Sequence, residues 1–167
     1  MRAIVVASAF AAVAAAASTA AADGRSEEKG TFGVGLLIGE PTGICAKLYL
    51  KDDQAVQFAL GSDFVAGGFQ VQADYVFHPW ILEERDSFTL PVYLGPGVRV
   101  FDYDKGRGGN SFFAVGIRAV GGIMFDFKNV PLDAFLEVAV VGEYGFSSSE
   151  GGFGVALNAG AGVRYYF

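Results

Sequence analysis

The sequence predicts an all-β protein, an eight-stranded antiparallel up-and-down barrel that crosses a membrane. Three observations lead to this fold class. Apolar residues alternate with polar or small ones, with a period of two, from Thr31 to the last residue. Turn-forming residues divide this alternating stretch into eight parts. Residues 1–22 have the pattern of a secretory signal peptide, which takes the chain out of the cytoplasm.

Charge and residue size identify the signal peptide. Arg2 supplies a positive start, residues 4–17 are an unbroken run of apolar and small residues, and the alanines up to Ala22 form a small-residue cleavage site. An uncleaved membrane helix is the alternative, but the run is rich in alanine and only weakly apolar for a spanning helix. A lipid anchor would need a cysteine directly after the cleavage site, and the single cysteine is Cys45. We therefore expect cleavage near Ala22.

After the signal peptide, residues 23–30 predict a short polar tail and residues 31–167 a single barrel domain. Each expected strand has one uniformly apolar face and one face of small or polar residues. The last strand is the clearest, because its fifteen residues alternate strictly, which is long for a strand of a soluble protein. In chain order the eight expected strands are Thr31–Gly39, Gly43–Lys51, Ala55–Asp63, Gly68–His78, Phe88–Phe101, Phe112–Asp126, Leu132–Gly142 and Phe153–Phe167.

The apolar faces justify these strands one by one. In the same order, their apolar positions are Phe32, Val34, Leu36 and Ile38; Ile44, Ala46, Leu48 and Leu50; Val56, Phe58 and Leu60; Phe69, Val71, Ala73, Tyr75 and Phe77; Leu90, Val92, Leu94, Val98 and Val100; Phe113, Val115, Ile117, Ala119, Ile123 and Phe125; Leu132, Ala134, Leu136, Val138 and Val140; and every odd residue from Phe153 to Phe167. The connectors contain turn-forming residues. They include Glu40–Thr42, Lys51–Gln54, Lys128–Pro131 and the Gly-rich stretches around 105–110 and 145–152.

The composition of the other face distinguishes a membrane barrel from a soluble one. A soluble barrel points its polar face at water, so that face would be rich in lysine and glutamate. Here it holds mostly glycine, alanine, glutamine and tyrosine, with about one charge per strand. This composition indicates a crowded interior, and the apolar face is then the one that lipid covers.

Aromatic residues predict two belts at opposite ends of the barrel, as membrane interfaces select. If both termini lie on one side, the belt near that side comprises Phe32, Phe77, Phe125, Tyr165 and Phe167, with Trp80 and Phe127 just beyond. The belt on the other side comprises Phe64, Phe69, Phe101, Phe113 and Phe153.

Composition also excludes several classes of function. The net charge of −6 over 167 residues argues against a basic surface for nucleic acid. One cysteine cannot form an internal disulfide, and one histidine cannot build a multi-histidine metal site. We expect neither a metal nor a cofactor.

The signal peptide, the amphipathic strands and the C-terminal Gly162-Val163-Arg164-Tyr165-Tyr166-Phe167 together resemble the small eight-stranded outer-membrane β-barrels of Gram-negative bacteria. The pattern of Gly162, Tyr165 and Phe167 is similar to the signal that the outer-membrane barrel assembly machinery reads. The resemblance covers residues 31–167 and implies an integral protein of the bacterial outer membrane with periplasmic termini. It implies outer-membrane lipid and the assembly machinery as partners, and we expect a monomer.

Within this class, residues 41–78 and 90–95 are similar to an uncharacterised outer-membrane β-barrel family, which implies no particular activity. Two features depart from the class. The first outer connector, Glu40–Thr42, is very short, and the connector Pro79–Ser87, on the expected periplasmic side, is longer than the tight turns of the class.

Interior charges are the most informative polar residues. We predict that Arg118 lies beside Glu137 on the neighbouring strand and that Arg164 lies near Asp133. An eight-stranded barrel is just wide enough for its side chains to fill, so such charges must pair or find water. A structural plug of ion pairs is the preferred hypothesis, and a narrow gated pore is the alternative. The predicted network comprises Lys47, Gln57, Asp74, Arg99, Arg118, Asp133, Glu137 and Arg164, with the first three at similar depth on consecutive strands.

No catalytic site is predicted. The single histidine, His78, stands at a strand end beside Pro79, and we expect it in the aromatic belt or a turn rather than as a general base. Cys45 faces the interior and is expected to fill space. Four acidic residues offer a carboxylate dyad as an alternative, but they fall in Gly-rich loops, where we expect them to be solvated: Asp102, Asp104, Glu143 and Glu150.

The predicted function is therefore non-enzymatic, either structural or mediated by binding through the outer loops. The stretches Phe101–Ser111 and Gly142–Gly152 combine tyrosine, serine, glycine and charges, as adaptable binding surfaces do. Two alternatives stay open. One is a narrow pore for ions or small solutes, and the other is a soluble periplasmic barrel that carries a ligand inside, as lipocalins do.

Overall fold

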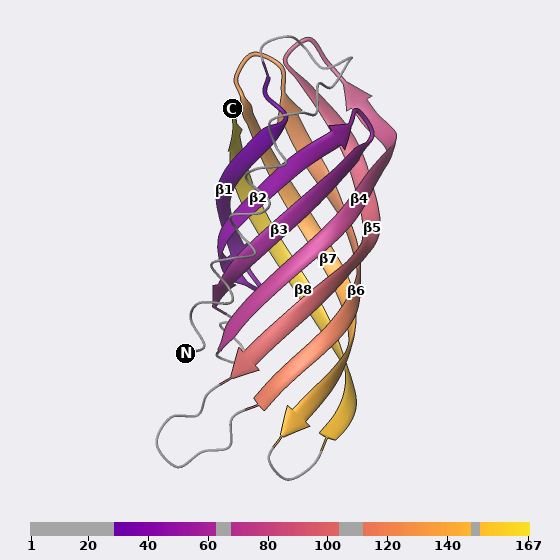
Figure 1. Cartoon of the computed structure of the whole chain (residues 1–167). Coiled ribbons are helices and arrows are strands. Elements are labelled where there is room, and N and C mark those ends of the chain that lie inside the picture. The colour runs from indigo at the N-terminus through magenta and orange to yellow at the C-terminus, as the bar shows by residue number, and fades with distance from the viewer. Residues whose placement is uncertain (1–28, 63–67, 104–111, 148–150) are drawn as a thin grey trace.

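A computed structural model of the chain describes residues 29–62, 68–103, 112–147 and 151–167. Eight antiparallel strands form one closed ring, in which each strand pairs with its sequence neighbours and β8 pairs with β1 (Figure 1). This confirms the predicted all-β barrel. In the described part of the chain, no helix has the length and apolarity to cross a membrane. The strands are β1 (Phe32–Gly39), β2 (Thr42–Lys51), β3 (Gln54–Ser62), β4 (Phe69–Glu84), β5 (Phe88–Tyr103), β6 (Phe112–Phe127), β7 (Leu132–Ser147) and β8 (Gly151–Tyr166).

The barrel has two different ends. We call the end where β1 begins and β8 finishes the terminal end, and the opposite end the loop end. The β2–β3, β4–β5 and β6–β7 turns lie at the terminal end, and the other four connections lie at the loop end. The expected signal peptide, residues 1–22, lies outside the described residues, as does most of the expected polar tail.

The strand register fixes the width of the barrel. Following the paired residues from Gly33 of β1 through β2–β7 leads to Ala156 of β8, whereas Gly33 itself pairs with Tyr166, ten residues further on. With eight strands, about 3.3 Å per residue and about 4.8 Å between strands, this shift gives a strand tilt of about 41° and a backbone radius of about 8 Å. Side chains alone can fill an interior of this radius.

The wall of the barrel is uneven in height. β1, β2 and β3 have 8, 10 and 9 residues, whereas each of β4–β8 has 16. Strands β5–β8 therefore extend beyond β1–β3 at the loop end, as Figure 1 shows. Two residues separate β1 from β2, one fewer than in the predicted connector Glu40–Thr42, because β2 already begins at Thr42. The Thr42 hydroxyl lies 2.9 Å from both the amide nitrogen and the carbonyl oxygen of Gly39.

Three expected connectors are partly strand. The expected connector Pro79–Ser87 is too long, because β4 continues to Glu84 and residues 85–87 alone separate it from β5. The β4–β5 register shifts between Phe77 and Trp80 and again between Ile81 and Glu83, and such bulges let a strand pass a proline. The expected outer loops also begin later than predicted, because β5 runs to Tyr103 and β7 to Ser147.

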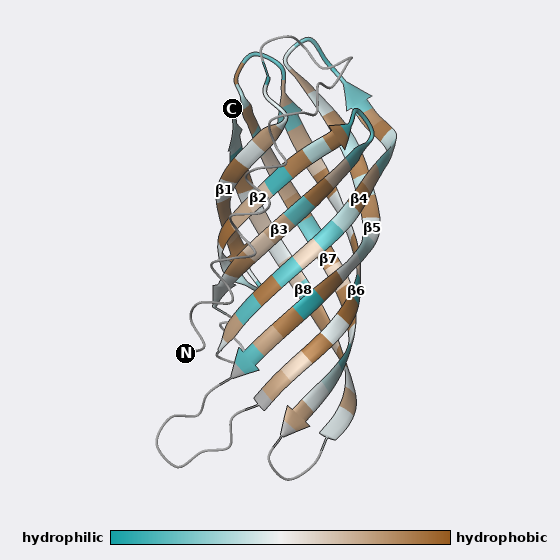
Figure 2. Ribbon diagram, viewed as in Figure 1, coloured by the Kyte–Doolittle hydropathy of each residue, from teal (hydrophilic) through white to brown (hydrophobic). Residues whose placement is uncertain are grey.

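Polar side chains lie inside the barrel and apolar side chains outside. Leu36, Ile117 and Leu157 are 67–74% exposed on the outer surface, whereas every member of the predicted interior network is at most 8% exposed. In Figure 2 hydrophilic and hydrophobic residues accordingly alternate along the strands. Phe101 does not belong to the outer aromatic belt in which it was predicted, because its side chain is buried beside the inward-facing Arg99. Phe64 lies outside the described residues.

Three interior aromatic rings cover glycines of the next strand. Tyr93 lies over Gly122, and a Cβ atom added there would come within 2.5 Å of the Tyr93 ring. Phe135 covers Gly162 and Tyr166 covers Gly33 in the same way. The glycines leave room for these large aromatic side chains inside the narrow barrel. The rings in turn protect strand positions that lack a side chain.

Replacing Gly122 by alanine is expected to lower the free energy of unfolding by about 1–3 kcal/mol, because the new methyl group overlaps both the Tyr93 ring and the Leu136 carbonyl oxygen. The matched control is Gly121→Ala on the same strand. A Cβ atom there meets only the Tyr93 carbonyl oxygen at 3.9 Å, so we expect a change within about 0.5 kcal/mol. Urea unfolding of both variants in detergent measures the difference, and equal effects would contradict the described register.

Candidate functional site: the buried ionic interior

Residues that pair across four strand boundaries build the centre of the interior. Lys47 pairs with Gln57, Gln57 with Asp74, Asp74 with Gly97, and Gly97 with Arg118. Gly97 is essential to this row. A Cβ atom on Gly97 would lie 1.8 Å from the Asp74 Oδ1 atom, so the carboxylate of β4 extends over the bare β5 backbone toward Arg118 of β6.

Arg118 is the hub of the central cluster. Its Nε atom lies 3.0 Å from Asp74 Oδ1, its Nη2 atom lies 3.5 Å from Glu137 Oε1, and it also donates to Gln72. Gln57 joins the two carboxylates, because its Nε2 atom lies 3.2 Å from Asp74 Oδ2 and 3.1 Å from Glu137 Oε2. The cluster thus holds one cation between two anions.

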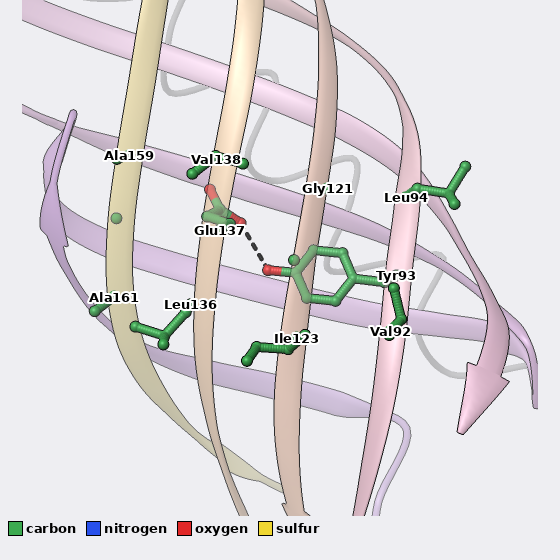
Figure 3. A pocket seen from close by; sticks show the side chains of 12 residues that line it. Val92, Tyr93, Leu94, Gly121, Ile123, Leu136, Glu137, Val138, Ala159 and Ala161 are labelled. Atoms are coloured by element: carbon green, nitrogen blue, oxygen red, sulfur yellow. Dashed lines mark hydrogen bonds between the residues drawn. The ribbon is translucent and has the colours of Figure 1, made fainter. Parts of the chain in front are cut away.

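Arg118 and Glu137 are not directly opposite each other on their neighbouring strands, contrary to the prediction. The cross-strand partner of Arg118 is Val141, and Glu137 faces Gly122, four residues away along β6. The two side chains still meet because the guanidinium is long. Tyr93 reaches the same carboxylate from β5 across β6, and its hydroxyl donates to Glu137 Oε2 at 3.0 Å (Figure 3).

A second cluster fills the terminal end. Arg164 and Asp133 are direct cross-strand partners, and Arg164 Nε lies 3.0 and 3.2 Å from the two carboxylate oxygens, as predicted. The Tyr166 hydroxyl donates to Asp133 at 2.5 Å, and the Arg164 guanidinium lies 4.0 Å from the centre of the Phe135 ring. Asp133 therefore has a cation and a hydroxyl as partners, although it is fully buried.

Lys47 belongs to the terminal cluster by its side chain. Its backbone lies in the row with Gln57, as expected, but its Nζ atom lies 2.8 Å from His78 Nε2 and 3.6 Å from the Met124 sulfur. The same ammonium lies 4.7 Å and 5.0 Å from the ring centres of Tyr49 and Tyr93. Aromatic faces and an imidazole nitrogen thus surround a fully buried cation.

A third cluster lies toward the loop end. Arg99 donates to Asn158 Oδ1 at 2.9 Å, and its Nη2 atom lies 3.6 Å from Glu143 Oε2. Asn158 in turn donates to the Glu40 carbonyl at 3.1 Å, which joins β8 to the β1–β2 connection. The expectation that Glu143 is solvated in a loop is wrong, because it lies in β7 and faces inward. Asp102 is exposed, while Asp104 and Glu150 lie outside the described residues.

The described interior is electrically balanced. The number of cations equals the number of carboxylates, and charges can be buried in a protein only when opposite charges compensate them. The cations are Lys47, Arg99, Arg118 and Arg164, and the carboxylates are Asp74, Asp133, Glu137 and Glu143. Lys29 and Asp126 add one further ion pair where the tail meets the terminal end.

Little empty space remains at the centre. A cavity of about 10 Å³ lies among Cys45, Gln57, Asp74 and Glu137, which is room for one water molecule at most. Cys45 is buried there, as predicted. The larger hollow of about 800 Å³ lies on the outer wall, where apolar side chains of β5–β8 surround Gly121 (Figure 3). Among the described residues, no group of three His, Cys, Asp or Glu side chains could hold a metal ion.

Several members of the clusters were not predicted from the sequence. They stand an even number of residues from predicted interior positions on the same strand, so the alternation alone indicates that they face inward. These residues are Gln70, Gln72, Tyr93, Met124, Asn158 and Tyr166. His78 was placed wrongly, because the bulged strand continues through it and its ring stacks on Tyr49 with centres 5.4 Å apart. Comparison of the chain with models of known protein families, with curated proteins and with solved structures finds no match. Its function is therefore inferred from the chemistry of the barrel itself.

Proposed function

We propose that this chain is an integral outer-membrane β-barrel without enzymatic activity, whose interior is closed by the buried ionic network. Its role is structural, or consists of binding through the loop end. The observation that carries the proposal is the inverted polarity of the barrel. In the part of the chain that the structure describes, eleven polar or charged residues are buried inside, while large apolar residues such as Ile38 and Val155 are 72% exposed outside. Water is a poor solvent for such an outer surface, and lipid is a good one.

The spacing of exposed aromatic residues supports the same proposal. On β6 the exposed Phe113 and Phe125 are twelve residues apart, and on β8 the exposed Phe153 and Tyr165 are also twelve apart. At a tilt of about 41°, twelve residues correspond to about 30 Å along the barrel axis. This matches the apolar thickness of a bilayer, about 25–30 Å.

Two of the three residues of the proposed C-terminal assembly signal are exposed on the outer surface, where another protein can contact them. Tyr165 and Phe167 are 47% and 73% exposed, and their rings lie 5.1 Å apart on the outer surface. Gly162 lies beneath Phe135 on the inner side. We propose that the two exposed rings are what the barrel assembly machinery recognises.

The closed interior favours a structural or binding role over transport. A ligand carrier needs an internal cavity, and a pore needs a water path, but the central cavity measures about 10 Å³. In planar bilayers at neutral pH we propose that the purified protein conducts no ions. Steady single-channel conductance would favour the narrow pore instead.

The single tryptophan provides a native test of membrane insertion. Trp80 is 61% exposed at the terminal end, where the proposal places a membrane interface. In reconstituted bilayers, nitroxide-labelled lipids should quench its fluorescence more strongly when the label is near the headgroup than when it is deep in the acyl chain. An Ile117→Trp variant in a Trp80→Phe background should show the reverse order. A protein that stays in the soluble periplasmic fraction, with Trp80 insensitive to both labels, would overturn the proposal.

A further inference from the structure

A continuous groove runs along the outer wall of the barrel over strands β5–β8. The hollow of about 800 Å³ around Gly121 shares Leu94 and Val138 with a hollow of about 460 Å³ on its loop-end side (Figure 3). It shares Leu136 and Ala161 with a hollow of about 540 Å³ on its terminal-end side. We call these three connected hollows the outer groove.

The sizes of the outward-facing residues produce the groove. Large and small residues alternate in one row of cross-strand partners over β5–β8, which comprises Leu94, Gly121, Val138 and Ala159. In the next row toward the terminal end, Ala161 stands beside Leu136 in the same way. The side chains of Leu94, Leu136 and Val138 are 42–59% exposed. The small residues therefore form the floor of the groove, and the larger residues form its walls.

The groove has the length of one leaflet of a bilayer. On β6 it extends from Ala119 to Phe125, which is one of the exposed aromatic residues near the terminal end. At the tilt of about 41°, these six residues correspond to about 15 Å along the barrel axis. The hydrocarbon core of a bilayer is about 30 Å thick, so each leaflet contributes about 15 Å. An extended acyl chain of one leaflet therefore matches the groove in length and in polarity.

A lysine follows the groove at the terminal end, on the side where the headgroup of such a lipid lies. Lys128 stands in the turn after β6, three residues beyond Phe125. Its ammonium lies 3.0 Å from Glu84 Oε1, but the two side chains are 36% and 65% exposed. An exposed pair of this kind contributes little stability, so a phosphate group can also contact the ammonium. The charge of Lys128 thus complements that of a phospholipid headgroup.

We propose that the outer groove binds one acyl chain of a phospholipid from the leaflet next to the terminal end, and that Lys128 contacts the phosphate of this lipid. This inference rests on the proposed function, because a barrel meets acyl chains at this depth only in a membrane. A chain in the groove contacts the floor and both walls, whereas a chain on a convex part of the barrel contacts one side. The bound lipid therefore stays on the barrel longer than its neighbours.

The experiment measures how much lipid the purified protein retains. The protein is mixed in detergent with palmitoyl-oleoyl-phosphatidylglycerol, separated from free lipid and weighed by native mass spectrometry. Gly121→Leu and Ala159→Leu fill the groove. The first is expected to fold, because a Cβ atom at Gly121 meets only the Tyr93 carbonyl oxygen at 3.9 Å. The matched control for the alanine substitution is Ala73→Leu, on β4 between the buried Gln72 and Asp74 and therefore on the outer face.

We expect the wild type and Ala73→Leu to retain one phospholipid per barrel. Each filling substitution should weaken binding by about tenfold, which corresponds to the loss of roughly two buried methylene groups of the chain. Lys128→Gln keeps the groove open and should weaken binding by about fivefold, the effect of one lysine on an anionic lipid. If either filling variant does not fold, the other and Lys128→Gln decide.

Equal retention by the wild type and the filling variants would overturn the inference. A dimer of the wild type that the filling variants lose would also overturn it, because a second copy of the chain would then occupy the groove. Quenching of Trp80 by nitroxide-labelled lipids, measured on the same protein, separates this inference from the proposed function. A barrel that inserts but retains no phospholipid contradicts the inference alone, and a barrel that does not insert contradicts both.

Discussion

Replacing Arg164 by methionine is expected to lower the free energy of unfolding by about 3–5 kcal/mol. The substitution leaves Asp133 fully buried with no guanidinium beside it, and an uncompensated buried charge costs more than the lost attraction alone. The Tyr166 hydroxyl still donates to this carboxylate, but a single neutral donor cannot replace a cation. Urea unfolding in detergent measures the effect.

A double-mutant cycle shows whether the loss comes from the pair. Arg164→Met combined with Asp133→Leu should cost less than the two single substitutions added together, because neither charge is then left alone. This pair suits the cycle better than Arg118 with Glu137, since Arg118 also contacts Asp74. The matched control is Arg85→Met. Its partner Glu83 lies 2.6 Å away, but the side chains are 65% and 45% exposed, so we expect at most about 1 kcal/mol. Equal losses at Arg164 and Arg85 would mean that water fills the interior.

Replacing Ile117 by arginine is expected to destabilise the inserted barrel by about 2–4 kcal/mol. Ile117 is 74% exposed on β6, and on the proposed function its side chain lies in hydrocarbon between the two aromatic levels. A guanidinium there must lose its water or distort the bilayer. Folding into vesicles, with unfolding in guanidinium chloride, measures the difference.

The same substitution near the membrane boundary gives the control. Phe113 lies four residues before Ile117 on the same outer face of β6, at the loop-end aromatic level. We expect Phe113→Arg to cost about 0–1 kcal/mol, because the charge reaches the headgroups. In a barrel that is surrounded by water, Arg at the highly exposed position 117 would change the stability by no more than about 0.5 kcal/mol. That result would exclude the lipid-facing wall.

The period of two predicted the interior well because the parity of a strand fixes which way each side chain points. Lys47, Asp74 and Arg164 could be assigned to the inside from alternation alone, and the direct Asp133–Arg164 pair followed from the tight turn between β6 and β7 and the chain end. The relative height of Arg118 and Glu137 could not be predicted in this way. It depends on the exact register of β6 and β7, in which Asp126 pairs with Asp133, and a slip of a few residues at the turn between them shifts every pair on the two strands.

Glycine and proline caused the remaining errors. The Gly-rich stretches predict loops, yet the described glycines of β7 and β8 lie within paired strands, and Glu143 faces the interior among them. Pro79 predicts the end of a strand, but a bulge carries β4 past it, and His78 thereby lies against Lys47. A local turn signal does not reveal whether neighbouring strands will hold the segment in the sheet.

The unequal strand lengths make the stability of the ring uneven. β1 has 8 residues and pairs with the 10-residue β2 and with the terminal-end half of β8, from Gly160 to Tyr166. By contrast, β5–β8 pair with one another along 16-residue strands. Each backbone hydrogen bond that must break adds to the free energy of local opening, so openings start where a strand makes the fewest. The least costly opening of the barrel therefore separates β1 from a neighbour and leaves the β5–β8 sheet intact. We therefore expect the amide protons of the closing strand β1 to exchange with water before those of the long strands, which hydrogen–deuterium exchange measures.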